Sequence, residues 1–267
     1  MLTTWALVTL ALCTGLVGLW LLYKRWNNVS VVDLGWSAAV GLGAVALCVL
    51  GPGEPTRKLI LGGVAGLHYA RLWWHLFRRF APHEEDPRYA VMMAGREGRT
   101  LDAWALGMFV FQGLVASALL TPFALVAWDE VPATHPLFWA GIALALGGMA
   151  LAAAADRQLR AFKADPATRG QTCRAGLWGW SRHPNYFGEW LVWCGFALAA
   201  TPASWPLGLA AWASAALMLH FLWNVTGIAP TEAHARKSRG ASYEAYVAEV
   251  SAFFPRPPRL GAPDAPR

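Results

Sequence analysis

Seven long apolar runs constrain the fold of this chain more than any other feature. A helix needs about 20 consecutive apolar residues to cross the hydrocarbon core of a bilayer. The runs are Trp5–Tyr23, Val31–Leu50, Leu59–Phe77, Leu101–Ala127, Leu137–Ala155, Tyr186–Ala200 and Ala203–Ile228. The 267-residue chain is 56% apolar and 14% charged, and it leaves no polar stretch long enough for a large soluble domain. We therefore predict an all-α, multi-spanning integral membrane protein with about seven transmembrane helices.

The basic residues predict the orientation of these helices. If the first loop faces the cytoplasm, all but three of the 22 Lys and Arg residues lie in cytoplasmic segments. The exceptions are Arg57 and Lys58 in an outer loop and Arg71 within a run. Cytoplasmic loops of membrane proteins carry such an excess, so we expect the N-terminus outside and the C-terminus in the cytoplasm. The net charge of +6 then belongs to one membrane face, and no compact basic domain exists to bind nucleic acid.

The four cysteines do not indicate a metal site or a disulfide framework. No two of Cys13, Cys48, Cys173 and Cys194 form a C-x-x-C pair. We predict a single membrane domain over residues 1–255 without a metal, and a loose tail over residues 256–267 that is rich in proline and basic residues. The first run lacks the flanking signals of a signal peptide, so we expect it to remain as a helix.

A polar cluster stands at the start of the sixth run. Residues 181–189 include Arg182, His183, Asn185, Tyr186 and Glu189. Polar groups are costly inside a bilayer, and those found there mark functional sites. A helix dipole stabilises a carboxylate near its N-terminus, which lowers the cost of Glu189. We interpret the cluster as part of a nucleotide cofactor site, with a structural role as the alternative for His183.

Two polar segments flank the last two runs and supply further candidates. In the first, Asp156, Arg160 and Lys163 share one face of a helix that Asp165-Pro166 is expected to end. The other candidates are Arg174, Trp178, Glu232, Arg239, Tyr243 and Tyr246. A plainer alternative is that the cations face lipid phosphates and the aromatic rings lie in the interfacial belt.

Three motifs resemble those of the steroid 5α-reductase family. The most specific combines Gly176-Leu177-Trp178, Arg182-His183-Pro184-Asn185-Tyr186 and Gly188-Glu189. The other two are the stretch Asp156-Arg157-Gln158-Leu159-Arg160-Ala161-Phe162-Lys163 and the early Asp33-Leu34-Gly35-Trp36. The set is most similar to bacterial membrane proteins that share the steroid 5α-reductase C-terminal domain, which implies a place in the bacterial inner membrane. Sterol C14 reductases share the pattern of Glu232, Gly240, Tyr243 and Tyr246, and isoprenylcysteine carboxyl methyltransferases share the Arg-His-Pro-x-Tyr motif.

The resemblance implies NADPH-dependent reduction of an activated carbon–carbon double bond in a lipid enone, such as a 3-oxo-Δ4 steroid. It implies that residues from about 140 to 255 hold NADPH on the cytoplasmic side. The cofactor residues expected from it are Asp156, Arg160, Lys163, Arg174, Trp178, Arg182, His183, Asn185, Tyr186, Glu189, Glu232, Arg239, Tyr243 and Tyr246. Cations suit this role because the phosphate groups of NADPH need charged hydrogen-bond donors.

The resemblance also implies a catalytic tyrosine. In the family, a tyrosine that follows a histidine donates a proton at the substrate carbonyl, and a glutamate from the preceding helix assists it. His68-Tyr69 matches the first pair, so we expect Tyr69 to be the proton donor. The preceding run holds Asp33 at a comparable separation in place of the glutamate, and Asp33 is the candidate partner.

Two other functions remain as alternatives. An S-adenosylmethionine-dependent membrane methyltransferase of the isoprenylcysteine carboxyl methyltransferase type would use the same Arg-His-Pro-x-Tyr framework. A non-catalytic lipid-binding membrane protein would keep the fold alone. The face from Asp156 to Lys163 and the His68-Tyr69 pair favour reduction, because methyl transfer needs neither. A transporter is disfavoured because no broken-helix pair recurs in both halves of the sequence.

Overall fold

The computed structural model describes residues 1–258, and this part of the chain folds into helices and turns without a β-strand, which confirms the all-α prediction. The α-helices are α1 (Leu2–Trp26), α2 (Val31–Leu50), α3 (Pro55–Phe77), α4 (Pro87–Met93), α5 (Gly98–Leu119), α6 (Thr121–Ala127), α7 (Pro136–Ala164), α8 (Pro184–Ala200), α9 (Trp212–His220), α10 (Ile228–Arg239) and α11 (Ala241–Glu249). Short 3₁₀ turns η1 (Pro166–Thr168), η2 (Gly176–Gly179) and η3 (Leu207–Ala211) and a π-helical turn η4 (Phe221–Val225) join them. Residues 259–267 of the predicted loose tail lie outside the described residues.

Several helices are suited to a membrane. Within residues 1–258, five segments are long and apolar enough to cross one: α1, α2, α5, α7 and the stretch Leu207–Arg239. The predicted third and sixth spans are helical, as α3 and α8, but neither is among these five, and α8 has only 17 residues. The count of seven spans and the orientation therefore stay predictions.

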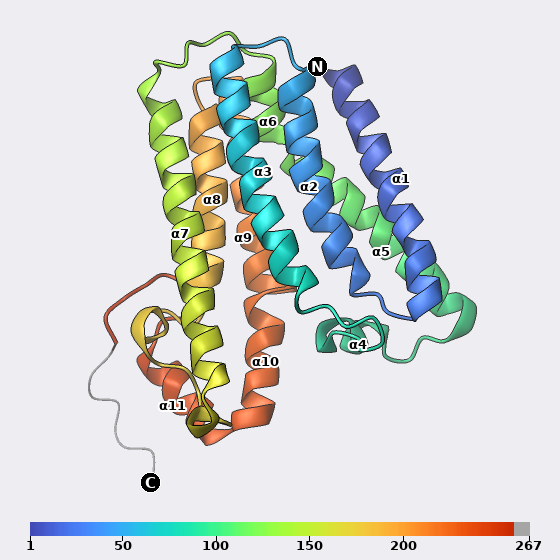
Figure 1. Cartoon of the computed structure of the whole chain (residues 1–267), viewed down its shortest axis with the longest axis vertical. Helices are drawn as coiled ribbons and strands as arrows, with labels where there is room; N and C mark the ends of the chain where they lie inside the picture. Colours follow the sequence, from blue (N-terminus) through green and yellow to red (C-terminus); the bar gives the residue numbers. More distant parts are fainter. Residues whose placement is uncertain (259–267) are drawn as a thin grey trace. The chain divides into compact units, whose positions relative to one another are not determined.

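The chain divides into two compact units, and the N-terminal unit comprises Met1–Ile142 and Phe196–Ser214. Helix α2 packs against α1, α3, α5 and α6, and α4 lies beyond the N-terminal end of α2 (Figure 1). Helix α1 buries only Val8, Leu16 and Tyr23, so most of its leucines are exposed, as expected for a helix that faces lipid.

One predicted span in this unit is not continuous. The run Leu101–Ala127 was expected to form one helix, but the structure separates α5 from α6 at Leu120. Pro122 explains the break because proline has no N–H to donate to the carbonyl of Ala118, four residues earlier.

The N-terminal end of α3 is fixed by a buried ion pair. Arg57 is completely buried, and its guanidinium donates to Asp129 at 2.9 Å. It also donates to the carbonyl oxygen of Ala199 at 3.3 Å, and Asp129 accepts the backbone N–H of Ser204 at 2.7 Å. The pair thus holds together three segments of the N-terminal unit that are far apart in sequence.

The C-terminal unit comprises Ala143–Gly195 and the residues from Ala215 onward. Helices α7 and α8 cross in backbone contact: a Cβ added at Gly188 would lie 2.7 Å from the carbonyl oxygen of Gly148 and 2.7 Å from the amide nitrogen of Ala152. Such small residues let helices approach closely. Helix α7 ends at Ala164, and Asp165 accepts the N–H of Ala167, which confirms the predicted stop at Asp165-Pro166.

Candidate functional site

Arg182 and Glu232 form the buried centre of the C-terminal unit. Arg182 donates from Nε to Glu232 Oε1 at 2.7 Å, and each side chain is less than a tenth exposed. The same guanidinium donates to the carbonyl oxygen of Val250 at 2.5 Å, just past the end of α11. The Arg182 N–H donates to the Ser251 carbonyl at 2.8 Å. Arg182 therefore joins the segment before α8 to α10 and α11.

His183 completes this cluster. Its Nε2 lies 3.2 Å from Glu232 Oε1, and its ring stacks on Tyr186 with centroids 5.3 Å apart. Burial lowers the pKa of His183, which favours the neutral imidazole. A neutral ring with the proton on Nε2 donates to the Glu232 carboxylate, so Glu232 is held by both neighbours.

A second polar pair links α7 and α8. Asn185 Nδ2 donates to Asp156 Oδ1 at 3.1 Å. Glu189 lies one turn further along α8 and is half-buried, whereas Arg160 and Lys163 are exposed on α7. The close helix crossing makes the pair possible, because Asn185 is one turn from Gly188 and Asp156 is one turn from Ala152.

Aromatic rings bring the remaining candidates together. Trp178 is buried and donates to the Ala155 carbonyl at 3.0 Å, so this ring belongs to the core of the unit rather than to an interfacial belt. Its own carbonyl accepts the phenol of Tyr246 at 2.6 Å. Tyr243 is buried beside Tyr246, and burial raises the pKa of both phenols.

Two arginines lie over these tyrosines. The guanidinium carbon of Arg174 is 5.5 Å from the ring centre of Tyr246, and that of Arg239 is 5.3 Å from the ring centre of Tyr243. Arg174 also forms an exposed ion pair with Glu249 at 2.7 Å. These contacts connect most of the C-terminal candidates, which lie on or beside α7, α8, α10 and α11.

The two candidate catalytic residues lie in the N-terminal unit. Tyr69 on α3 is only 2% exposed and packs directly on α2, where a Cβ added at Gly41 would lie 2.6 Å from the Tyr69 Cβ. Its ring meets Trp36 edge-on, with centroids 6.3 Å apart. The adjacent His68 is completely buried.

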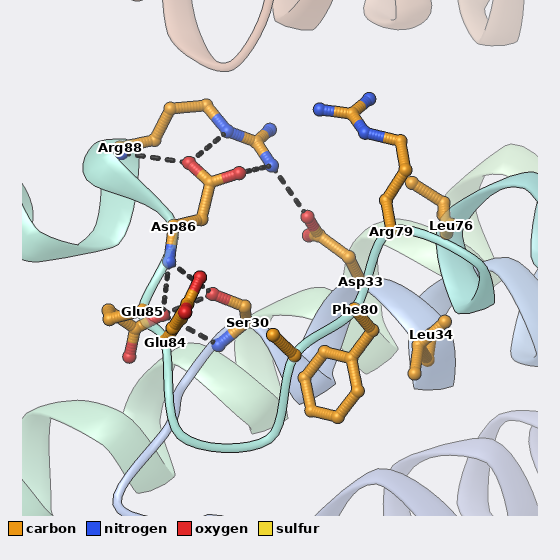
Figure 2. A pocket seen from close by; sticks show the side chains of 11 residues that line it. Ser30, Asp33, Leu34, Leu76, Arg79, Phe80, Glu84, Glu85, Asp86 and Arg88 are labelled. Atoms are coloured by element: carbon orange, nitrogen blue, oxygen red, sulfur yellow. Dashed lines mark hydrogen bonds and ion pairs between the residues drawn. The ribbon is translucent and has the colours of Figure 1, made fainter.

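Asp33 has a different set of neighbours. Its Oδ1 accepts the phenol of Tyr89 at 2.6 Å. Its Oδ2 accepts Arg88 at 2.8 Å (Figure 2). Both partners lie on α4, so these two hydrogen bonds join Asp33 to α4. Burial and the charge of Asp33 together raise the pKa of Tyr89.

A polar cavity of about 250 Å³ borders this contact. Figure 2 shows the guanidinium groups of Arg79 and Arg88 on its rim, with Asp33 between them. Glu85 accepts the backbone N–H groups of Val29 at 2.6 Å and Ser30 at 3.0 Å, and so caps the start of α2. The loop before α4 is thereby attached to the start of α2.

The sequence reasoning missed this attachment. An Asp-Pro pair at 86–87 is a helix-start signal, and Asp86 does accept the N–H of Arg88 at 2.9 Å. That signal predicts a short helix, but it does not reveal that Arg88 and Tyr89 reach a residue more than 50 positions earlier.

The chain matches one protein family over most of its length. Residues 19–250 match the family described as "Protein of unknown function (DUF1295)". Among curated proteins, it is 38% identical over 121 residues to 3-oxo-5-alpha-steroid 4-dehydrogenase 1 of Rattus norvegicus, covering 45% of this chain and 44% of that protein. It is 31% identical over 166 residues to the protein of the same name from Bos taurus, covering 58% and 57%.

The protein of the same name from Homo sapiens is 34% identical over 127 residues, which cover 47% of each chain. The matches therefore span about half the length of these relatives. The chain belongs to the DUF1295 family, a family of steroid 5α-reductase-like proteins.

Proposed function

We propose that this protein is a membrane-embedded, NADPH-dependent reductase of an activated carbon–carbon double bond in a lipid enone, such as a 3-oxo-Δ4 steroid. The observation that carries the proposal is the similarity to relatives named 3-oxo-5-alpha-steroid 4-dehydrogenase 1. The connected polar residues of the C-terminal unit support it, because they are the residues that the resemblance assigns to the cofactor.

The C-terminal residues suit a phosphate-bearing nucleotide. Arg160 and Lys163 are exposed cations on the helix that carries Asp156, and they can reach the phosphate groups of a bound nucleotide. The half-buried Asp156–Asn185 pair offers amide and carboxylate groups for hydrogen bonds. We assign these residues to the dinucleotide, and we assign Arg182, His183 and Glu232 to holding the surrounding segments in place.

The N-terminal residues supply the proton in this proposal. NADPH would provide the hydride, and negative charge then develops on the carbonyl oxygen of the enone. A hydroxyl held at that oxygen stabilises the charge and donates a proton. We assign this role to Tyr69. We propose that Asp33 acts indirectly: it holds Arg88 and Tyr89 of α4 against the start of α2.

Ligand-induced stabilisation of the detergent-solubilised protein tests the cofactor. A ligand at 100 times its Kd adds about 2.7 kcal/mol to the free energy of unfolding. NADPH is expected to raise the melting temperature, and S-adenosylmethionine is not. Stabilisation by S-adenosylmethionine alone would instead indicate the methyltransferase, and stabilisation by neither would favour a lipid-binding protein.

Tyr69→Phe tests the proton donor. Turnover of a 3-oxo-Δ4 steroid, followed by NADPH absorbance, should fall at least about 100-fold, while stabilisation by NADPH is retained. Tyr23→Phe is the matched control, because Tyr23 is another buried tyrosine of the same unit and bonds to Asp102. Full activity in Tyr69→Phe would refute the assignment.

Asn185→Ala and Glu189→Ala test the nucleotide residues. Each should weaken NADPH binding about tenfold or more, because a hydrogen bond to a charged ligand contributes about 1.5–3 kcal/mol. Gln171→Ala is the control, since this exposed side chain donates only to the Ala167 carbonyl among the described contacts. Unchanged NADPH affinity in both variants would refute the site.

The membrane topology belongs to the same proposal. Seven spans with the N-terminus outside would put the C-terminal polar segments in the cytoplasm, where soluble nucleotides are available. Labelling of single cysteines introduced at the exposed positions 27 and 52 from either side of inverted and right-side-out vesicles would test it. Labelling of both positions from the same side would contradict the orientation.

A further inference from the structure

The last apolar stretch of the chain is a broken helix. Leu207–Arg239 is long and apolar enough to cross a membrane, yet its regular helix stops at His220. A π-helical turn over Phe221–Val225 follows, then two residues that are not helical, and α10 begins at Ile228. This break lies wholly within the C-terminal unit.

Three residues account for the break. The Thr226 N–H donates to the Phe221 carbonyl at 2.9 Å, one residue further back than in an α-helix. A Cβ at Gly227 would lie 2.1 Å from the carbonyl oxygen of Leu222, so this backbone path requires glycine. Pro230 has no N–H to donate to the Thr226 carbonyl, four residues earlier.

Two exposed polar side chains stand at this break. Asn224 Nδ2 lies 3.2 Å from His220 Nδ1, and both residues are exposed. Because the amide donates to Nδ1, the neutral imidazole carries its proton on Nε2. The pair therefore offers an Nε2–H donor and an amide oxygen acceptor.

The pair stands far from either end of the apolar stretch. His220 is 12 residues before Glu232 and 13 residues after Leu207. Irregular backbone at membrane depth is tolerated only inside protein or against a polar cavity, and polar side chains there are costly unless they serve a site.

We propose that His220 and Asn224 recognise a hydroxyl or carbonyl oxygen on the lipid substrate, remote from the enone that is reduced. This inference rests on the proposed reductase function and narrows its substrate class to lipids that carry such a second oxygen. The neighbouring Trp223 is 38% exposed and packs on Phe253 with ring centroids 5.4 Å apart, so it offers a flat apolar surface beside the polar pair. A fused-ring lipid suits both features.

Two matched 3-oxo-Δ4 steroids test the inference, one with a hydroxyl at carbon 17 and one with hydrogen there. Binding is measured by thermal stabilisation of the full-length protein in detergent, and reduction by kcat/KM with NADPH. The wild-type protein should prefer the hydroxyl steroid roughly 10- to 100-fold, as expected for one or two hydrogen bonds. Asn224→Leu and His220→Leu should each bring this preference close to 1, whereas Ser238→Ala, at an exposed position of α10, should keep it.

The outcomes separate this inference from the proposed function. Equal binding of the two steroids by the wild-type protein, or an unchanged preference in both leucine variants, overturns the inference. A hydroxyl preference without any NADPH-dependent reduction overturns the proposed reductase and leaves the binding site in place. Failure to bind either steroid overturns both. If Asn224→Leu does not fold, Asn224→Ser, which stays polar but is too short to reach the same oxygen, takes its place and should also lose the preference.

Discussion

Each of the two units contains a buried pair of an arginine and a carboxylate, but the two pairs have different surroundings. Arg57 and Asp129 lie 2.9 Å apart, and Arg182 and Glu232 lie 2.7 Å apart. In both pairs the arginine also donates to backbone carbonyls, so each pair fixes the ends of neighbouring segments. The first pair has no candidate cofactor residue among its hydrogen-bond partners, whereas the second pair consists of two candidates and has a third, His183, as a partner.

The difference teaches that a buried charged cluster in this chain is not by itself a sign of a ligand. Arg182, His183 and Glu232 bond to one another and to backbone carbonyls within the described part of the C-terminal unit. The half-buried Asp156–Asn185 pair and the exposed cations after it are better placed to meet a ligand. The predictions below test this division, from the largest expected effect to the smallest.

Arg57→Met should cause the largest loss of stability. Removal of one partner leaves Asp129 buried without its counter-charge, which costs about 3–5 kcal/mol of the free energy of unfolding. Thermal or chemical unfolding in detergent measures the loss. The NADPH affinity of the folded fraction should stay at the wild-type value. If Arg57→Met loses as much NADPH affinity as Glu232→Gln, the two ion pairs do not differ in their relation to the cofactor.

Glu232→Gln should cost less stability, about 1.5–3 kcal/mol, because the amide keeps part of the hydrogen bonding to Arg182. Any change in NADPH affinity should be smaller than that of Asn185→Ala, measured by titration of the folded protein. Glu244→Gln is the control, since Glu244 pairs with Arg236 at the surface. A larger loss of affinity in Glu232→Gln than in Asn185→Ala would place the ligand on the buried pair instead.

Acid should affect the two clusters in different pH ranges. Burial lowers the pKa of His183, so the unfolded chain takes up its proton first, and stability is lost as pH falls below about 6.5. For Asp129, burial alone would raise the pKa, but hydrogen bonds from Val131 and Ser204 outweigh it and lower the pKa. Its stabilising contribution is therefore present above about pH 4 and is lost only below that.

The melting temperature between pH 7 and pH 5 measures the His183 contribution. The stability of the wild-type protein should fall by at most about 1.4 kcal/mol per pH unit from this one group, and His183→Gln should remove that part of the slope. His83→Gln, at an exposed position, serves as the control. An unchanged slope in His183→Gln would contradict the prediction.

Arg174→Gln should have the smallest effect. Its ion pair with Glu249 is exposed on both sides, so the loss should be about 0–1 kcal/mol in thermal unfolding. If this variant nevertheless loses NADPH affinity, Arg174 contacts the phosphate groups as the resemblance implies. If NADPH affinity stays at the wild-type value, the role of Arg174 is limited to its surface contact with Glu249 of α11.

The helices could be predicted from the sequence because their signals are local. Apolar runs located α1, α2 and α7, and Asp165-Pro166 located the end of α7. The spacing of Asp156, Arg160 and Lys163 correctly placed them on one helix. Motif spacing also selected Asn185 and Asp156, although their hydrogen bond depends on two glycines whose contact is not visible in sequence.

Long-range contacts and helix irregularities could not be predicted in this way. Arg57 was counted as an outer-loop charge, yet it is completely buried on a partner 72 residues away. Asp33 was proposed as the partner of Tyr69 from the resemblance and a comparable separation, but its hydrogen bonds to Arg88 and Tyr89 of α4 could not be foreseen. The break at residues 221–227 had signals in Gly227 and Pro230, but glycine and proline are common in membrane helices and did not stand out.

The close crossing of α7 and α8 has a consequence for biogenesis. At 1.5 Å per residue, the 17 residues of α8 extend about 26 Å, less than the roughly 30 Å of hydrocarbon in a bilayer. Asn185 and Glu189 are polar residues in the first turns of α8. They lower the tendency of this helix to pass from the translocon into the membrane without a partner helix. Its glycine contact with the long α7 offers a partner, so we expect the two helices to enter the membrane as a preassembled hairpin.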